Sequence, residues 1–204
     1  MAISEMTRPV LDSGDHLTRP EFHRRYSQQP DSVRAELVEG VVYVASPVRM
    51  YHAEPHAIVI TWLGAYKARH PEVRLGDNAT VLLDADNEIQ PDACLCRPAP
   101  DGPPINADGY IEGAPELVVE VAASSASYDL HEKLRAYRRN GVREYVVWRV
   151  LDRAIDWFRL AGGDYLPVTP DASGVIESST FPGLRLHVGK ILAGDLAGAL
   201  AELR

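Results

Sequence analysis

The sequence predicts one α/β (α+β) domain in which helices flank a mixed central sheet that carries extra antiparallel strands. Three observations support this class. The chain has 204 residues, a length that suits one domain. Residues 115–150 read as strand, helix and strand, which implies a parallel pair of strands joined by a crossover. Short strand pairs separated by turn residues lie on both sides of this unit, as antiparallel additions do.

The first half of the chain begins with residues 1–17, which lack hydrophobic periodicity and are expected to form a flexible arm. A single domain is expected over residues 18–204. Thr18, Pro20 and Glu21 form a typical helix start. The elements expected after it are a helix to Gln28, strands at 34–39 and 41–45 joined by a Glu39-Gly40 turn, a loop at 47–55, a helix at 56–69, a strand pair at 72–76 and 79–83, an acidic turn at 84–88, a strand at 91–97 and a long loop at 98–113.

The second half of the chain contains the strand–helix–strand unit. Residues 115–123 include a nearly continuous apolar run, which is typical of a strand buried on both faces. Asp129 and Glu132 resemble a capping box and predict a helix over 129–140 that ends before Gly141. The elements expected after it are strands at 144–150, 154–160 and 164–168 and a final helix at 188–204.

The net charge and the distribution of apolar residues indicate which partners and which cellular compartment to expect. The net charge of −8 weighs against loose binding to nucleic acid but leaves room for a local basic groove. No apolar run is long enough to cross a bilayer, and the first residues do not form a signal peptide, so we expect a cytoplasmic protein without membrane contact. Cys94 and Cys96 would point to one face of a strand and are expected to stay reduced.

Two charged residues lie where folding alone would not place them. Glu120 interrupts the apolar strand, and a buried carboxylate is costly unless it is paired or bound to a metal. Its structural alternative is a pair with an arginine at the rim of the sheet. Lys133 falls within the inward stripe formed by Leu130, Leu134 and Tyr137, so it should face the sheet. Its structural alternative is a lysine whose stem lies on the core while the ammonium reaches solvent.

Asp92 supplies the third candidate, because it follows Pro91 at the start of a strand. The pair alone is a weak signal, but an Asp and a Glu on neighbouring strands and a Lys on the helix that packs across them could converge at one sheet edge. Two carboxylates suit Mg²⁺ or Mn²⁺, which can activate water and stabilise charge on a phosphate oxygen. A nearby lysine can orient the water. These groups are suited to metal-dependent hydrolysis of phosphodiesters.

At these residues the sequence resembles a known family, the Uma-two family, which is a branch of the PD-(D/E)xK nuclease superfamily of restriction endonucleases. The resemblance covers roughly residues 30–190. It rests on six short motifs in order: Glu36-Leu-Val-Glu-Gly40, Ser46-Pro47, Pro91-Asp92, Pro115-Glu-Leu-Val-Val-Glu-Val121, Tyr128-Asp-Leu-His-Glu-Lys-Leu134 and Asn140-Gly-Val-Arg-Glu-Tyr145.

The resemblance implies a restriction-endonuclease-like core and a homodimeric DNA endonuclease. Asp92 and Glu120 would bind Mg²⁺ or Mn²⁺, with the Val121 carbonyl as a further ligand. The superfamily pattern has a lysine two residues after the acid, whereas this chain has Ala122. The resemblance implies that the lysine has moved to the following helix, where it would be Lys133.

Several hypotheses about the function and about individual residues are compatible with the sequence. The acidic net charge and Ala122 also suit a non-catalytic homodimeric binding or regulatory module, and nothing separates DNA from RNA or from a small phosphoester. Glu36 matches an early Glu of the family but could be an ordinary strand residue. Pro55 speaks against a helix through His52, so His52 and His56 are expected at a loop or helix start. The arginines that could contact phosphate, or simply lie at a solvated helix end, are Arg138, Arg139 and Arg143.

Overall fold

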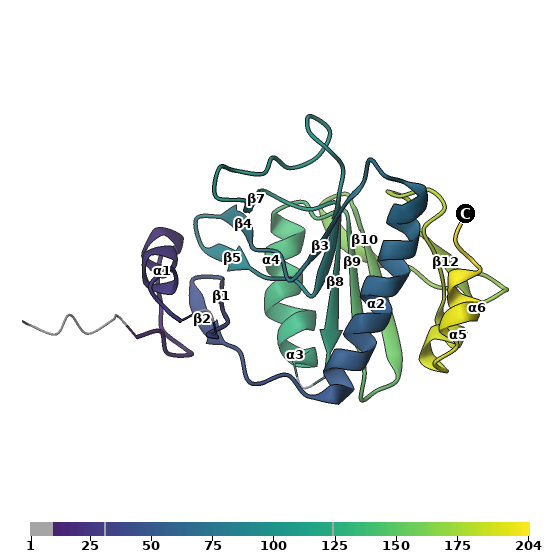
Figure 1. Ribbon diagram of the computed structural model, residues 1–204, viewed down its shortest axis with the longest axis horizontal. Coiled ribbons are helices and arrows are strands. Elements are labelled where there is room, and N and C mark those ends of the chain that lie inside the picture. Colours follow the sequence, from purple (N-terminus) through teal and green to yellow (C-terminus); the bar gives the residue numbers. More distant parts are fainter. Residues whose placement is uncertain (1–9, 31, 124) are drawn as a thin grey trace, which may run out of the picture.

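A six-stranded mixed sheet forms the centre of the protein, whose computed structural model describes residues 10–30, 32–123 and 125–204 (Figure 1). Within this sheet β8 and β9 run parallel, as the strand–helix–strand unit predicts, and the other neighbours are antiparallel. The mixed sheet confirms the predicted fold class. In spatial order the strands are β11 (Asp164–Pro167), β10 (Ala154–Ala161), β9 (Glu144–Arg149), β8 (Leu117–Ala122), β6 (Ala93–Cys96) and β3 (Arg74–Asp77).

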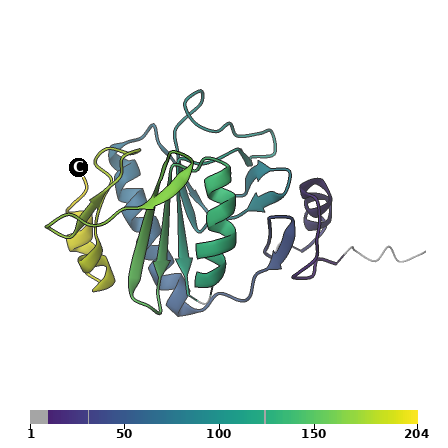
Figure 2. The ribbon, with the colours of Figure 1, turned by 180° about the vertical axis from the view of Figure 1, so that it is seen from behind.

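Helices cover both faces of this sheet, as Figure 1 and the reverse view in Figure 2 show. Helix α2 (Met50–Arg69) packs on the face that carries Leu117, Val119 and Val121 of β8. The opposite face carries Val118 and Ala122 and meets a helix built from three consecutive parts. These parts are α3 (Ala126–Tyr128), the π-helical turn η1 (Asp129–Lys133) and α4 (Leu134–Arg139). Because side chains alternate along a strand, Glu120 points to the η1 and α4 face.

A second, smaller sheet lies beyond α4 and has the order β2-β1-β5-β4-β7. Its β1–β2 hairpin turns at Glu39 and Gly40, which both have positive φ (52° and 75°), as a tight hairpin turn requires. The predicted hairpin is therefore confirmed. The strands of this sheet are β1 (Ala35–Val38), β2 (Val41–Val44), β4 (Val81–Asp84), β5 (Asn87–Ile89) and β7 (Ile111–Glu112).

The N-terminal residues pack against this second sheet. Residues 1–9 of the predicted arm lie outside the described residues. In the part that is described, Leu11 is buried with Phe22 of helix α1 (Arg19–Tyr26), and the Gly14 amide donates to the Val42 carbonyl. These contacts hold residues 10–17 along the β1–β2 hairpin.

Two strand predictions in the first half of the chain are wrong. Residues 72–76 and 79–83 were expected to pair with each other, but β3 pairs with β6 in the central sheet and β4 pairs with β5 in the second sheet. The chain changes sheets at Asn78, whose φ is 50° and whose amide donates to the Asp92 carbonyl. The expected acidic turn at 84–88 is shorter, because β5 already begins at Asn87.

Three helix boundaries also differ from those expected. Helix α2 begins at Met50 and continues through Pro55, because the missing proline donor falls near the helix start and costs one hydrogen bond there. The 129–140 helix begins earlier, at Ala126, so Asp129 is not its cap. The expected 188–204 helix breaks at Gly194 (φ 78°) into two short helices that follow a hairpin. These elements are β12 (Val175–Glu177), β13 (Arg185–His187), α5 (Val188–Leu192) and α6 (Leu196–Leu200).

None of the helices in the described ranges combines the length and the apolar character that a bilayer crossing requires.

Candidate functional site

Asp92 and Glu120 meet where β6 begins and β8 approaches its end. Ala93 pairs with Val119, so the preceding and following residues, Asp92 and Glu120, are brought side by side. The Asp92 amide lies 3.4 Å from Glu120 Oε2, and the Asp92 carboxylate accepts a 2.6 Å hydrogen bond from the Val121 amide. The predicted convergence of these two carboxylates at one sheet edge is therefore present in the fold.

Lys133 reaches the same edge from the η1 turn and completes the predicted set of three residues. Its Nζ lies 3.0 Å from Glu120 Oε1, and both side chains are about 5% exposed or less. Lys133 therefore faces the sheet, and the alternative in which its ammonium reaches solvent is wrong. The arginine partner considered for Glu120 is replaced by this lysine. The η1 turn is wider than an α-helical turn, a feature that often occurs at functional sites.

Further side chains that the sequence did not single out, or left unclear, complete the polar cluster. Tyr137, one turn after Lys133, donates a 2.8 Å hydrogen bond to Glu120 Oε1. Glu36 of β1 lies 3.0 Å from Lys133 Nζ, so it is more than an ordinary strand residue. Asp129 is buried, accepts from the Ser125 hydroxyl and lies 3.9 Å from Lys133 Nζ. Its spacing of four residues from Lys133 was the available sequence signal.

Charge is unevenly balanced in this cluster. Burial raises the pKa of Glu120 well above its usual range, although the Lys133 ammonium opposes the shift. Burial alone would lower the pKa of Lys133, but Glu120, Glu36 and Asp129 together raise it well above its usual range. We conclude that Lys133 is charged, because it faces several carboxylates at once. One ammonium cannot neutralise all of them, so the cluster favours additional positive charge, which a proton or a cation can supply.

Two histidines lie on the α2 side of Asp92. His52 Nε2 is 3.2 Å from Asp92 Oδ1, and His52 Nδ1 is 2.9 Å from the Val121 carbonyl oxygen. The hydrogen bond with Asp92 raises the pKa of His52 against the effect of burial. Burial alone would raise the pKa of Asp92, but the hydrogen bonds from His52 and Val121 lower it below its usual range. His56 Nε2 lies 2.9 Å from the Asp92 carbonyl oxygen.

This position of His52 corrects the sequence interpretation. Both histidines were expected at a loop or helix start, and a continuous helix through His52 was not expected because of Pro55. His52 does lie in the first turn of α2, but the helix continues through Pro55, so the two histidines are one helical turn apart. Residues with this spacing share a helix face, which is why both rings reach Asp92.

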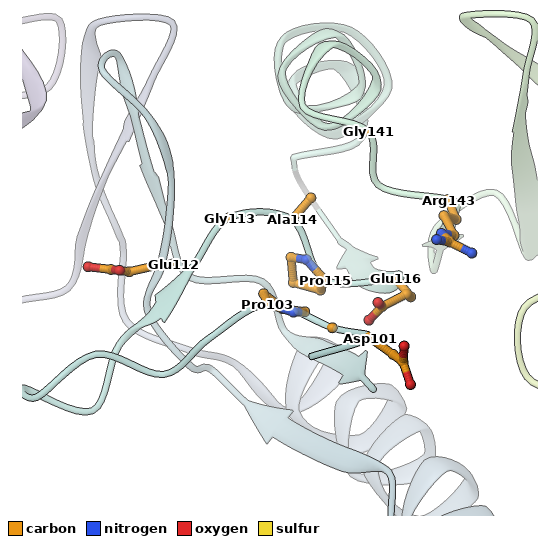
Figure 3. Close-up of a pocket in the computed structure, with 10 residues that line it drawn as sticks. Asp101, Pro103, Glu112, Gly113, Ala114, Pro115, Glu116, Gly141 and Arg143 are labelled. Atoms are coloured by element: carbon orange, nitrogen blue, oxygen red, sulfur yellow. The ribbon is translucent and has the colours of Figure 1, made fainter. Parts of the chain in front are cut away.

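The expected cluster of arginines does not belong to this site. Arg139 pairs with Glu39 and Asp84, and Arg138 pairs with Asp164, so both are held in surface ion pairs. Arg143 lines a hollow of about 310 Å³ together with Glu116 and Asp101, which Figure 3 shows. Glu116 and Glu120 are separated by four residues of extended chain, which corresponds to about 13 Å along the strand. This hollow is therefore remote from Asp92 and Glu120.

Comparison with known proteins identifies the family of the chain. The model of the Uma2 (Uma-two) family, which is described as "Putative restriction endonuclease", matches residues 19–189. The chain belongs to the Uma2 family.

A solved structure shares the fold of this Uma2 chain. It is described as a putative nuclease belonging to DUF820 from Anabaena variabilis ATCC 29413. The two superpose with a TM-score of 0.66 at 12% sequence identity, over 87% of this chain and 97% of the other. A search of curated proteins finds no match. At this low identity the similarity establishes the nuclease-type fold alone.

The departure of this Uma2 chain from the superfamily pattern has a structural explanation. Ala122 is buried on the face of β8 that Glu120 also occupies, against α4. Position 122 therefore provides no ammonium, whereas Lys133 of the helix lies 3.0 Å from Glu120. A lysine thus contacts the acidic residue although the local motif is absent.

Proposed function

We propose that this Uma2 protein is a metal-dependent endonuclease that hydrolyses phosphodiester bonds of DNA. The observation that carries the proposal is the convergence of Asp92, Glu120 and Lys133 at one edge of a nuclease-type sheet, in a chain of this family. In this proposal Asp92 and Glu120 hold Mg²⁺ or Mn²⁺, with the Val121 carbonyl as a further ligand.

The residues at this edge fit a divalent cation. Carboxylate and carbonyl oxygens are the donors that Mg²⁺ and Mn²⁺ prefer. Burial raises the pKa of Glu120 although Lys133 opposes the shift, so the negative charge of this carboxylate is unfavourable without a further cation or a proton. A bound divalent ion would supply that positive charge, lower the pKa of a bound water and stabilise charge on a phosphate oxygen.

The surrounding side chains would orient these carboxylates. The Val121 amide donates a hydrogen bond to the Asp92 carboxylate. The Tyr137 hydroxyl and the Lys133 ammonium donate hydrogen bonds to the Glu120 carboxylate, so both carboxylates are held in position by neighbouring groups. The sequence suggested that Lys133 assists the attacking water. Its burial among Glu120, Glu36 and Asp129 favours a different role, in which Lys133 positions Glu120 and opposes the rise in its pKa that burial causes.

A non-catalytic homodimeric module that keeps the nuclease fold is the alternative function. Ala122 and the acidic net charge suggested it. The contact between Lys133 and Glu120 favours the catalytic proposal, because it places an ammonium beside the acidic residue although position 122 holds an alanine. Homodimer formation is part of both proposals and is tested by light scattering of the purified protein.

The test combines metal binding and cleavage. Calorimetric titration with Mn²⁺ and Mg²⁺ would be carried out on the wild type and on Asp92→Ala and Glu120→Gln, together with nicking assays on supercoiled plasmid and on RNA. We expect metal-dependent DNA cleavage that both variants lose while their circular dichroism spectra stay unchanged. Asp108→Asn, in an exposed loop, is the matched control and should cleave normally. Unchanged cleavage by Asp92→Ala would refute the proposal, and cleavage of RNA alone would correct its substrate.

A further inference from the structure

The geometry around Asp92 provides nitrogen ligands as well as oxygen ligands. His52, His56 and Asp92 each offer one ligand atom, and these three atoms lie within 4.8 Å of one another. Within the described ranges this is the group of His, Cys, Asp and Glu side chains compact enough to hold one ion. Glu120 is not one of these three residues: Lys133 and Tyr137 hold its Oε1 atom, while its Oε2 atom lies 3.4 Å from the Asp92 amide.

The tautomer of His52 leaves its Nε2 atom available for a metal. The Val121 carbonyl can only accept a hydrogen bond, so His52 Nδ1 carries the hydrogen of this 2.9 Å contact. In a neutral ring Nε2 then has its lone pair directed at Asp92 Oδ1, 3.2 Å away. Two lone pairs at this distance repel each other unless a proton or a metal cation lies between them. Metal-bound histidines commonly donate their second ring N–H to a backbone carbonyl in this manner.

The distance between two of the donor atoms is compatible with a metal site. Adjacent ligands of an octahedral ion with bonds of about 2.1 Å lie about 3.0 Å apart. The distance of 3.2 Å between His52 Nε2 and Asp92 Oδ1 is close to this value. The side chains of His52, His56 and Asp92 are 23%, 18% and 13% exposed, so the group is accessible to an ion and to the waters that would complete its shell.

The polypeptide holds the two rings in place independently of any ion. His52 and His56 are one turn apart on α2, and Trp62 and Leu63 further along that helix are buried against the central sheet. His56 Nε2 also lies 3.1 Å from Asp77 Oδ1 of β3, which limits the rotation of its ring. Ligands mounted on rigid elements in this way require little reorganisation on binding.

We propose that His52, His56 and Asp92 form a binding site for a first-row transition ion such as Mn²⁺ or Zn²⁺, in preference to Mg²⁺. Imidazole nitrogen binds such ions much better than it binds Mg²⁺, which prefers oxygen and retains its waters. The inference deepens the proposed function and rests on it only in placing the metal at Asp92. It assigns to His52 and His56 the role of metal ligands and to Val121 the role of fixing the His52 tautomer.

The competing interpretation is a metal-free ion pair between a protonated His52 and Asp92. Both interpretations predict that removal of His52 affects stability. They differ in two respects, because an ion pair provides no nitrogen ligand to a metal and gives no reason for a preference between Mn²⁺ and Mg²⁺. The test therefore uses the metal alone, without nucleic acid.

The experiment measures Mn²⁺, Zn²⁺ and Mg²⁺ affinity by calorimetry and nitrogen hyperfine coupling to bound Mn²⁺ by pulsed electron paramagnetic resonance. Wild type should show imidazole coupling. His52→Gln and His56→Gln should each reduce that coupling and weaken Mn²⁺ binding by at least the roughly 10- to 100-fold typical of a lost outer-shell partner. Mg²⁺ affinity should change much less. The matched control is His70→Gln, at the opposite end of the same helix, which should behave as wild type.

The outcomes separate this inference from the proposed function. Bound Mn²⁺ without nitrogen coupling, or unchanged Mn²⁺ affinity in His52→Gln, would overturn the inference even if DNA cleavage persists. Nitrogen coupling that His52→Gln removes, in a protein that cleaves no nucleic acid, would support the inference while the nuclease proposal fails. If His52→Gln does not fold, His56→Gln together with the coupling in wild type decides the question.

Discussion

Lys133 Nζ and Glu120 Oε1 lie 3.0 Å apart in the interior of the protein, and both side chains are almost fully buried. They come from different elements, η1 and β8. A charge without its partner at such depth is strongly unfavourable, whereas a matched pair is tolerated. The pair therefore links the packing of the helix to the geometry of the proposed metal site.

Substitution of Lys133 should destabilise the folded protein. We expect Lys133→Met to lower the free energy of unfolding by about 3–5 kcal/mol, because it leaves the Glu120 carboxylate buried without a cation. Urea denaturation followed by circular dichroism measures the change. The double variant Glu120→Gln/Lys133→Met should recover part of the loss. A double variant as unstable as the sum of the single variants would contradict a direct coupling between the two residues.

Tyr137 should contribute to both stability and metal binding through its hydroxyl. Its hydrogen bond to Glu120 is 2.8 Å long and buried, so Tyr137→Phe should destabilise the fold by about 1–3 kcal/mol. If Glu120 is a ligand, Mn²⁺ affinity should also fall by about tenfold or more. Tyr165→Phe is the control, because the Tyr165 hydroxyl donates to the Val142 carbonyl and does not contact the site. Equal metal affinity in both variants would argue against Glu120 as a ligand.

Metal should stabilise the folded protein. An ion that binds only the native state raises the free energy of unfolding by about 2.7 kcal/mol when its free concentration is about 100 times its dissociation constant. We expect thermal unfolding of wild type to shift upward with Mn²⁺ and to return with a chelator. Asp92→Ala should show no shift. A metal-induced shift that survives in Asp92→Ala would place the ion elsewhere on the protein.

Acid stability should depend on Asp84, which anchors the end of α4 to the second sheet. Burial acts to raise the pKa of Asp84, but hydrogen bonds from Arg139, Asn140 and Asn87 outweigh it and lower the pKa to about 2. A lowered folded-state pKa contributes stability that is present above the unfolded value of about 3.9 and is lost as pH falls toward about 2.

The measurement is the free energy of unfolding of wild type and Asp84→Asn between neutral pH and about pH 2. The variant should be less stable at neutral pH, and the difference should shrink as the solution becomes acidic. Asp164→Asn, which removes the exposed partner of Arg138, should change stability by no more than about 0.5 kcal/mol. A difference that stays constant with pH would show that Asp84 contributes little to acid unfolding.

Local patterns predicted the elements that carry strong periodicity. The apolar run of β8, the parallel strand β9 and the hairpin at Glu39-Gly40 follow from side-chain pattern and turn chemistry alone. The inward position of Lys133 follows from helical spacing. The convergence of Asp92, Glu120 and Lys133 could also be predicted from the sequence, because it depends only on two neighbouring strands and on the helix that connects β8 to β9.

Other features depended on contacts between distant segments. Pro55 stops a helix by local rules, yet packing of α2 on the central sheet outweighs the loss of one hydrogen bond near the helix start. The partners of β3 and β4 were misassigned because strand pairing is decided by the sheet as a whole and not by the intervening turn. The short hairpin of β12 and β13 carried too weak a pattern to be recognised.

The fold class, the family resemblance and the three charged residues at the sheet edge could be predicted before folding is considered, because they depend on periodicity, spacing and order along the chain. The surroundings of those residues could not, because they come from segments that meet only in the folded protein. Glu36 lies 97 positions from Lys133 and His52 lies 69 positions from Val121, yet each pair is in contact. Hydrogen bonds and charges act over a few ångströms in space, so no local pattern could place His52 against Asp92 before the chain had folded.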